Sequence, residues 1–118
     1  MPFYMTQWTY KEREIKALVS HPQRRIEAAR KLFESFGGKL HHFFFAFGEY
    51  DGLLIAEMPD NEVMTACLMT VVGAGGVSSI KTMVLLTPEE AERAMTKAGA
   101  ASSGYAPPSG QEPPWRGP

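Results

Sequence analysis

The chain has 118 residues, of which 44% are hydrophobic and 21% are charged, and its formal net charge is −1 at pH 7. That length supports one domain with a single core, and the composition is that of an ordinary globular protein. A net charge this close to zero argues against nucleic-acid binding as the main role, because phosphate binding needs a basic surface.

The cysteine content and the N-terminal residues indicate the cellular compartment in which the protein is expected. The single cysteine, Cys67, excludes a disulfide within the chain and fits a reducing environment. Residues 1–5 lack the basic segment and the long apolar core of a secretory signal. Residues 63–80 are uncharged, but threonines, serines and glycines interrupt them. We therefore expect a cytoplasmic protein without a membrane span.

The first part of the chain predicts a strand followed by helices. Residues 3–10 alternate between two sets of side chains rich in aromatic and β-branched residues, which is typical of a strand. Residues 11–19 are charged with one apolar side, which indicates a short helix. Ser20-His21-Pro22 is a helix-start signal, and an apolar stripe over residues 26–36 predicts an amphipathic helix. Gly37-Gly38 ends it in the left-handed conformation.

The middle of the chain predicts a hairpin. Residues 39–47 are strongly aromatic and apolar on both faces, so both faces of this strand are expected to be covered. Gly48 and Gly52 are expected to take positive φ angles in a turn, where Asp51 bonds nearby backbone. The strand 53–58 follows, and the short connection implies antiparallel pairing.

The rest of the chain predicts a helix, a strand and a further helix. Asp60 is a good N-cap for a helix over residues 60–72, which carries no charge past Glu62 and is expected to be buried on more than one side. Residues 77–86 alternate as a strand, and residues 87–98 begin with a threonine cap, a proline and two acids, as helices do.

Strand, helix, strand, strand, helix, strand is the order of an α+β ferredoxin-like βαββαβ sandwich, here with an extra C-terminal helix. Residues 1–98 are expected to form this domain, and residues 99–118 a Pro/Gly-rich tail. Helices cover one face of such a sheet, and the other face is too apolar to meet water. The economical cover is a second copy, which gives a dimeric α+β barrel.

The segment Gly48-Glu49-Tyr50-Asp51, followed by an apolar strand, resembles the motif of the GYD domain family. The resemblance extends over residues 3–98. Its other landmarks, in chain order, are Arg25-Ile26-Glu27-Ala28-Ala29-Arg30, Gly37-Gly38, Glu57, Pro59-Asp60, Gly75-Gly76-Val77 and Thr82. It implies a ferredoxin-like fold that assembles through its sheet, and it implies no particular reaction. Gly52-Leu53 departs from the family, which more often runs straight into valines.

Five acidic residues cluster without a basic neighbour: Glu49, Asp51, Glu57, Asp60 and Glu62. They could converge on a cation or act as a base, but turns and helix caps are the usual use of Asp at such positions. Glu57 shares the parity of the apolar residues of its strand, so it is expected to point inward. Lys81 could pair with it.

His41 and His42 are expected on opposite faces of their strand, as neighbours in a strand must be. They therefore cannot share one metal ion, and no metal site is predicted. The aromatic residues could line a pocket for a planar ligand, although filling the core and a dimer seam is favoured. These aromatics are Tyr4, Trp8, Phe43, Phe45, Phe47 and Tyr50. Cys67 is interpreted as an unreactive buried thiol.

The favoured function is a homo-oligomeric module that binds a partner or a small apolar or aromatic ligand. The expected ligand-binding residues are Tyr4, Trp8, Phe45, Tyr50, Asp51 and Lys81. The alternative is a cofactor-light enzyme of the barrel-monooxygenase kind, acting on a planar aromatic or quinone-like substrate with Glu57 or His42 as proton handler. No cofactor is predicted, and haem and flavin stay open.

Overall fold

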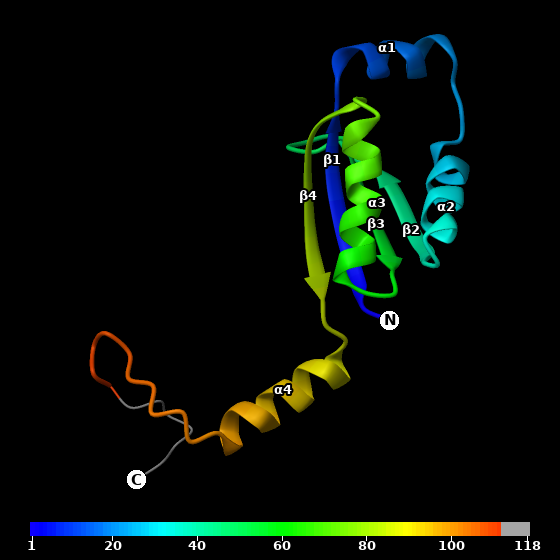
Figure 1. The fold of residues 1–118 in the computed structure, drawn as a ribbon. Coiled ribbons are helices and arrows are strands. Elements are labelled where there is room, and N and C mark those ends of the chain that lie inside the picture. The colour runs from blue at the N-terminus through cyan, green and yellow to red at the C-terminus, as the bar shows by residue number, and fades with distance from the viewer. Residues whose placement is uncertain (112–118) are drawn as a thin grey trace. The chain divides into compact units, whose positions relative to one another are not determined.

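The computed structural model describes residues 1–111 (Figure 1). The strands are β1 (Phe3–Tyr10), β2 (Lys39–Phe45), β3 (Gly52–Glu57) and β4 (Val77–Leu85), and the helices are α1 (Glu12–Ser20), α2 (Arg25–Ser35), α3 (Asn61–Gly73) and α4 (Pro88–Ala100). The strands form one four-stranded sheet in the order β2-β3-β1-β4, with every neighbouring pair antiparallel. This confirms the predicted ferredoxin-like α+β fold.

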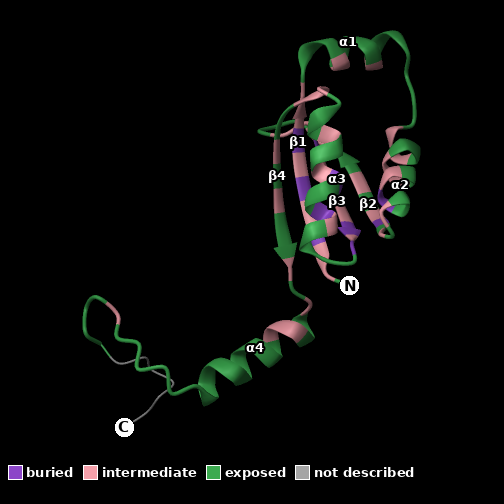
Figure 2. Cartoon of the chain, viewed as in Figure 1, coloured by how far each residue is buried: buried purple, intermediate pink, exposed green. Residues whose placement is uncertain are grey.

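The helices α2 and α3 lie on one face of this sheet (Figure 1). The core between the two layers is built from the alternate residues of β1 and β3 that face the helices, and Figure 2 shows this burial along both strands. Its buried apolar members are Tyr4, Trp8, Phe33, Leu40, Leu54, Ala56, Met58, Met64 and Cys67. The period of two in the strands therefore assigns one side-chain set to the core and leaves the other on the far face.

Several ends of elements are as the sequence predicts. Asp60 caps α3 by accepting a 2.8 Å hydrogen bond from the N–H of Val63. Gly37 takes a φ of 80° after the last turn of α2, as a left-handed cap requires. Thr87 and Glu90 form a reciprocal capping box at the start of α4.

Three expectations are wrong. Helix α2 begins at Arg25 rather than at Pro22, because the N–H of His21 still closes the last turn of α1. Strand β2 ends at Phe45, so Phe47 lies in a loop and is fully exposed. The uncharged helix α3 has one buried side only, which carries Met64 and Cys67, and its Met69 is 69% exposed.

The chain divides into two compact units, Met1–Leu85 and Leu86–Pro118. The first contains the whole sheet with α1, α2 and α3. The second contains α4 and a tight turn near Pro107–Gly110, and the predicted tail beyond residue 111 lies outside the described residues. None of the helices in residues 1–111 combines the length and the apolar character that crossing a lipid bilayer requires.

Candidate functional site

Asp51 joins the connection between β2 and β3 to the end of β1. Its Oδ2 atom accepts a 2.8 Å hydrogen bond from the backbone N–H of Tyr10, and its own N–H donates to the carbonyl of Trp8 at 2.8 Å. Its carbonyl accepts a bond of 2.9 Å from the N–H of Ala46. The carboxylate thus bonds backbone, as expected, but the backbone belongs to β1 rather than to the turn. Its role is to hold the hairpin against the central strand.

The glycines that bracket this motif serve a different purpose from the predicted one. Neither Gly48 nor Gly52 has a positive φ. Gly52 lies opposite Trp8 in the sheet, and a Cβ at this position would collide with the indole ring. Around Gly48 the space is open. Gly52 is therefore required by the close approach of Trp8 rather than by the turn.

The sheet face away from α2 and α3 is called the open face here, and no helix of residues 1–85 lies on it (Figure 1). In the strand register its side chains include Phe3, Met5, Gln7, Thr9, His42, Phe44, Leu53, Ile55, Glu57, Lys81, Met83 and Leu85. Phe44 is 57% exposed and Met83 is 40% exposed. The apolar members therefore form a continuous surface in contact with solvent.

A bulge in β2 places both histidines on the open face. The register with β3 shifts between Leu40 and His42, so that His41 is the extra residue and His42 lies opposite Ile55. The His41 ring is 5.4 Å from that of Phe3, another open-face residue, and the His42 ring stacks on Phe44. The expectation of opposite faces is wrong because it assumed an unbroken alternation.

Glu57 has a different partner from the predicted one. Its Oε1 atom lies 2.7 Å from Nε2 of His41, and both side chains are about one quarter exposed. Lys81 lies opposite Gln7 on β4 and is exposed, with β1 between it and β3. Glu57 does share a face with Ile55, as its parity predicts, but that face is the open one.

A cavity of about 370 Å³ lies on the other face, between the sheet and the two helices. Trp8 and Phe43 contribute aromatic rings 5.2 Å apart to its floor. One wall comes from α2 through Ala28, and the other comes from α3 through Leu68. The sequence pattern does not predict these walls, and the adjacent small residues Ala28 and Ala29 of α2 are the signal that could have indicated them.

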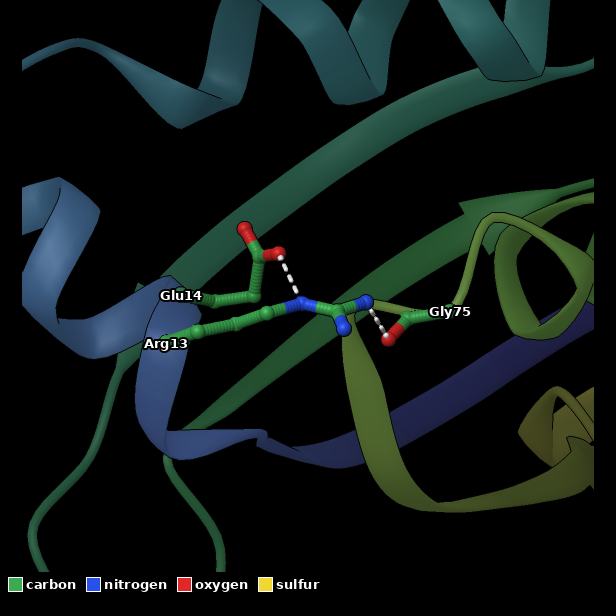
Figure 3. A network of polar contacts seen from close by, with 3 residues as sticks. All are labelled: Arg13, Glu14 and Gly75. Atoms are coloured by element: carbon green, nitrogen blue, oxygen red, sulfur yellow. Dashed lines mark hydrogen bonds and ion pairs between the residues drawn. The ribbon is translucent and has the colours of Figure 1, made fainter.

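Arg13 joins helix α1 to the connection between α3 and β4 (Figure 3). The Nη2 atom of Arg13 donates a 2.6 Å hydrogen bond to the carbonyl of Gly75, and its Nε lies 3.2 Å from Oε1 of Glu14. Glu14 and Gly76 both line the cavity. The α3–β4 connection and α1 therefore form one end of the cavity together.

The structure separates the predicted ligand-binding residues. Trp8 lines the cavity, whereas Tyr4 is buried in the core, where its hydroxyl donates a 2.6 Å bond to Asn61. Burial, and next the nearby carboxylate of Asp60, raise the pKa of Tyr4. Phe45 is 53% exposed at the end of β2, and Tyr50 is half-buried in the loop beside Asp51. Lys81 is on the open face, as are the predicted catalytic residues Glu57 and His42.

Comparison with known proteins identifies the family. Among curated proteins, none matches the chain. A solved structure titled "crystal structure of FFRP-DM1" is similar over 73% of this chain and 100% of its own, with 16% sequence identity and a TM-score of 0.45. The model of the GYD domain matches residues 4–95, which hold all of the sheet except Phe3, together with the motif around Asp51. The chain therefore belongs to the GYD domain family.

Proposed function

We propose that this protein is a homo-oligomeric binding module whose open face packs against the same face of a second copy. The observation that carries the proposal is the apolar centre of that face, formed by Met5, Ile55 and Met83 in one row across three strands. Phe3, Leu53 and Phe44 extend it on neighbouring rows. Monomeric soluble proteins seldom leave so continuous an apolar surface uncovered, and burying it against a twin removes it from water.

The polar residues of the open face favour pairing of this face with the same face of a second copy. Lys39, His41 and Glu57 lie at one corner, where β2 and β3 meet the row of Phe3. Lys81 lies at the diagonally opposite corner, on β4. Consider two copies that pair face to face about a two-fold axis along the other diagonal of the face. Each of these two corners then lies over the opposite corner of the partner copy. Lys81 of one copy then meets Glu57 of the other, twice, and the two sheets cross at a wide angle.

Light scattering coupled to size exclusion tests the pairing. The expected mass at micromolar concentration is at least twice the 13.1 kDa of one chain. Ile55→Lys places a charge in the apolar centre and should give a folded monomer, as checked by circular dichroism. Met69→Lys, on the exposed side of α3, is the matched control and should leave the mass unchanged. A wild-type chain that stays monomeric contradicts the proposal.

One observation favours the enzymatic alternative. The contact of 2.7 Å between His41 and Glu57 is a carboxylate–histidine pair, and a paired sheet would enclose it together with His42. Such a pair can accept a proton from a planar aromatic or quinone-like substrate held among the open-face aromatics. An activity screen with hydroquinones tests this, because Glu57→Gln removes the negative charge while keeping the shape. Turnover that survives this substitution contradicts the role.

A further inference from the structure

The cavity between the sheet and the helices combines an apolar depth with a polar rim. Its deepest lining residues are buried: Thr6, Trp8, Phe33 and Leu54. The hydroxyl of Thr6 already shares a 2.8 Å hydrogen bond with the hydroxyl of Thr82. The deep part of the cavity is therefore mainly apolar on this side. The rim residues Arg25, Glu14 and Thr70 are half-buried or exposed. A ligand that fits must therefore be apolar inside and polar at the rim.

The protein's own side chains do not fill this space. Helix α2 presents the small residues Ala28 and Ala29 towards it, which leaves room above the aromatic floor. Protein interiors are normally packed without voids larger than a water molecule. A volume of about 370 Å³ corresponds to roughly a dozen waters against mainly apolar walls. It lies at the lower end of the range for small-molecule sites, which suits one or two aromatic rings.

The floor of the cavity is suited to a flat molecule. The indole of Trp8 lies over Gly52, where no side chain can displace it, so its position is fixed by the sheet. Phe43 at 5.2 Å and Tyr10 at 6.2 Å flank the indole, and both also line the cavity. Aromatic rings arranged in this way favour stacking or edge contacts with another ring system.

The charges at the rim favour an anionic group on the ligand. Among the described residues no carboxylate forms an ion pair with Arg25, whose Nη1 donates only to the side chain of Gln23 at 3.0 Å. The carboxylate of Glu14 is already paired with Arg13 at 3.2 Å. The guanidinium of Arg25 is therefore the charge left for a ligand, and guanidinium binds carboxylates through two parallel hydrogen bonds.

From these observations we infer that the cavity binds a small aromatic carboxylate, with its rings on Trp8 and Phe43 and its carboxylate on Arg25. The inference rests on the proposed role as a binding module, but it does not require the pairing of the open face. The two surfaces lie on opposite sides of the sheet, so each can fail without the other. Scattering mass measured on the same samples distinguishes the two failures.

Titration with 2-naphthoate, followed by ¹H–¹⁵N correlation spectra of the full chain, tests the inference. The signals of the Trp8 indole N–H and of the amides of Ala28 and Leu68 should move together and saturate. The uncharged analogue 2-naphthalenemethanol should bind about tenfold more weakly, because it lacks the charge-assisted bonds to Arg25. Arg25→Gln should remove this difference, whereas the adjacent, exposed Arg24→Gln should preserve it.

A second pair of variants tests the location. Ala28→Phe fills the cavity from α2 and should abolish binding of both probes, whereas Ala66→Phe, on the exposed side of α3, should not. Thermal unfolding of each variant confirms that it is folded. The inference is overturned if 2-naphthoate does not bind at millimolar concentration, if the shifts fall on Met5 and Ile55 instead, or if Ala28→Phe or Arg25→Gln binds as the wild type does.

Discussion

The indole of Trp8 occupies the space that a Cβ on Gly52 would need, across the register pair that these two residues form between β1 and β3. The ring is 6% exposed and belongs both to the core and to the floor of the cavity. A single glycine in the hairpin therefore determines where the largest side chain of the sheet lies.

Gly52→Ala should lower the free energy of unfolding by about 2 kcal/mol, since even one methyl group must displace a packed ring. Gly48→Ala is the matched control in the same loop and should change stability by less than about 0.5 kcal/mol, because nothing lies near its Cβ position. Urea unfolding of both variants measures the difference. Equal effects at the two glycines would contradict the role assigned to Trp8.

The sequence predicts the turn correctly at these glycines but gives the wrong reason for them. Two glycines around Tyr50-Asp51 indicate positive φ angles, and the hairpin follows from that pattern. The real constraint on Gly52 is a contact with a residue 44 positions earlier, on a strand whose register no local pattern specifies. Local propensity thus identifies the hairpin, whereas tertiary packing against Trp8 explains the glycine at position 52.

The histidines show a second limit of pattern analysis. Alternation assigns His41 and His42 to opposite faces, and the same assumption holds along β3 and from Phe3 to Thr9 in β1. One extra residue in β2 breaks the period, and the local sequence of aromatics and histidines carries no mark of it. The bulge brings His41 to Glu57, which is the contact that the predicted Lys81 pair should have made.

Asp51→Ala should lower the free energy of unfolding by about 1–2 kcal/mol, because the backbone N–H of Tyr10 loses a charged acceptor at 2.8 Å. Glu49→Ala removes a carboxylate from the same loop at an exposed position and should have little effect. Amide hydrogen exchange adds a local measure, because the Tyr10 amide should exchange faster in the Asp51 variant only. Unchanged protection of that amide would contradict the assigned hydrogen bond.

The thiol of Cys67 should make stability fall at high pH. Its side chain is fully buried, and burial raises its pKa to about 11. In the unfolded chain the thiol ionises near pH 8.5 to 9. Between these values the unfolded state has released the proton and the folded state still holds it, so unfolding is favoured as the pH rises. Below about pH 8 the contribution of this group to stability is complete.

The measurement compares urea unfolding of the wild type and Cys67→Ala from pH 7 to pH 10.5. The variant is less stable at every pH because it leaves a cavity, but its curve should fall less steeply above pH 8.5. The expected difference in slope accumulates to the order of 2 kcal/mol at the upper end. Other groups, including Tyr4, titrate equally in both proteins and cancel in the comparison. Parallel curves would show that the thiol ionises alike in the folded and unfolded states.

The cavity was not predictable from the sequence for a geometrical reason. Ala28 and Ala29 fit an amphipathic helix, and Leu68 fits an apolar one, so each was assigned to its element correctly. The space arises because α2 and α3 cover the sheet without closing over Trp8, and spacing between helices is a property of the assembled layers. Composition could indicate aromatic residues suited to a pocket, but the predicted set combined cavity residues such as Trp8 and Phe43 with the core residue Tyr4 and the loop residues Phe47 and Tyr50.

Charge reversal tests the geometry proposed for the paired sheets. Lys81→Glu should raise the dissociation constant of the dimer about a hundredfold, because the proposed axis brings residue 81 of each copy to Glu57 of the other, and the substitution makes two like-charged contacts. Glu57→Lys should weaken pairing similarly and also breaks the contact with His41 within its own chain. The double variant restores opposite charges and should recover most of the affinity.

Lys31→Glu, an exposed change on α2, serves as the control for altered net charge. Sedimentation equilibrium at low and high salt measures the wild type and all four variants, and the difference in dissociation constant between the wild type and the two single charge reversals should shrink with salt. If the double variant is as weak as the sum of the singles, the open faces pair about a different axis, and Lys81 and Glu57 do not meet across it.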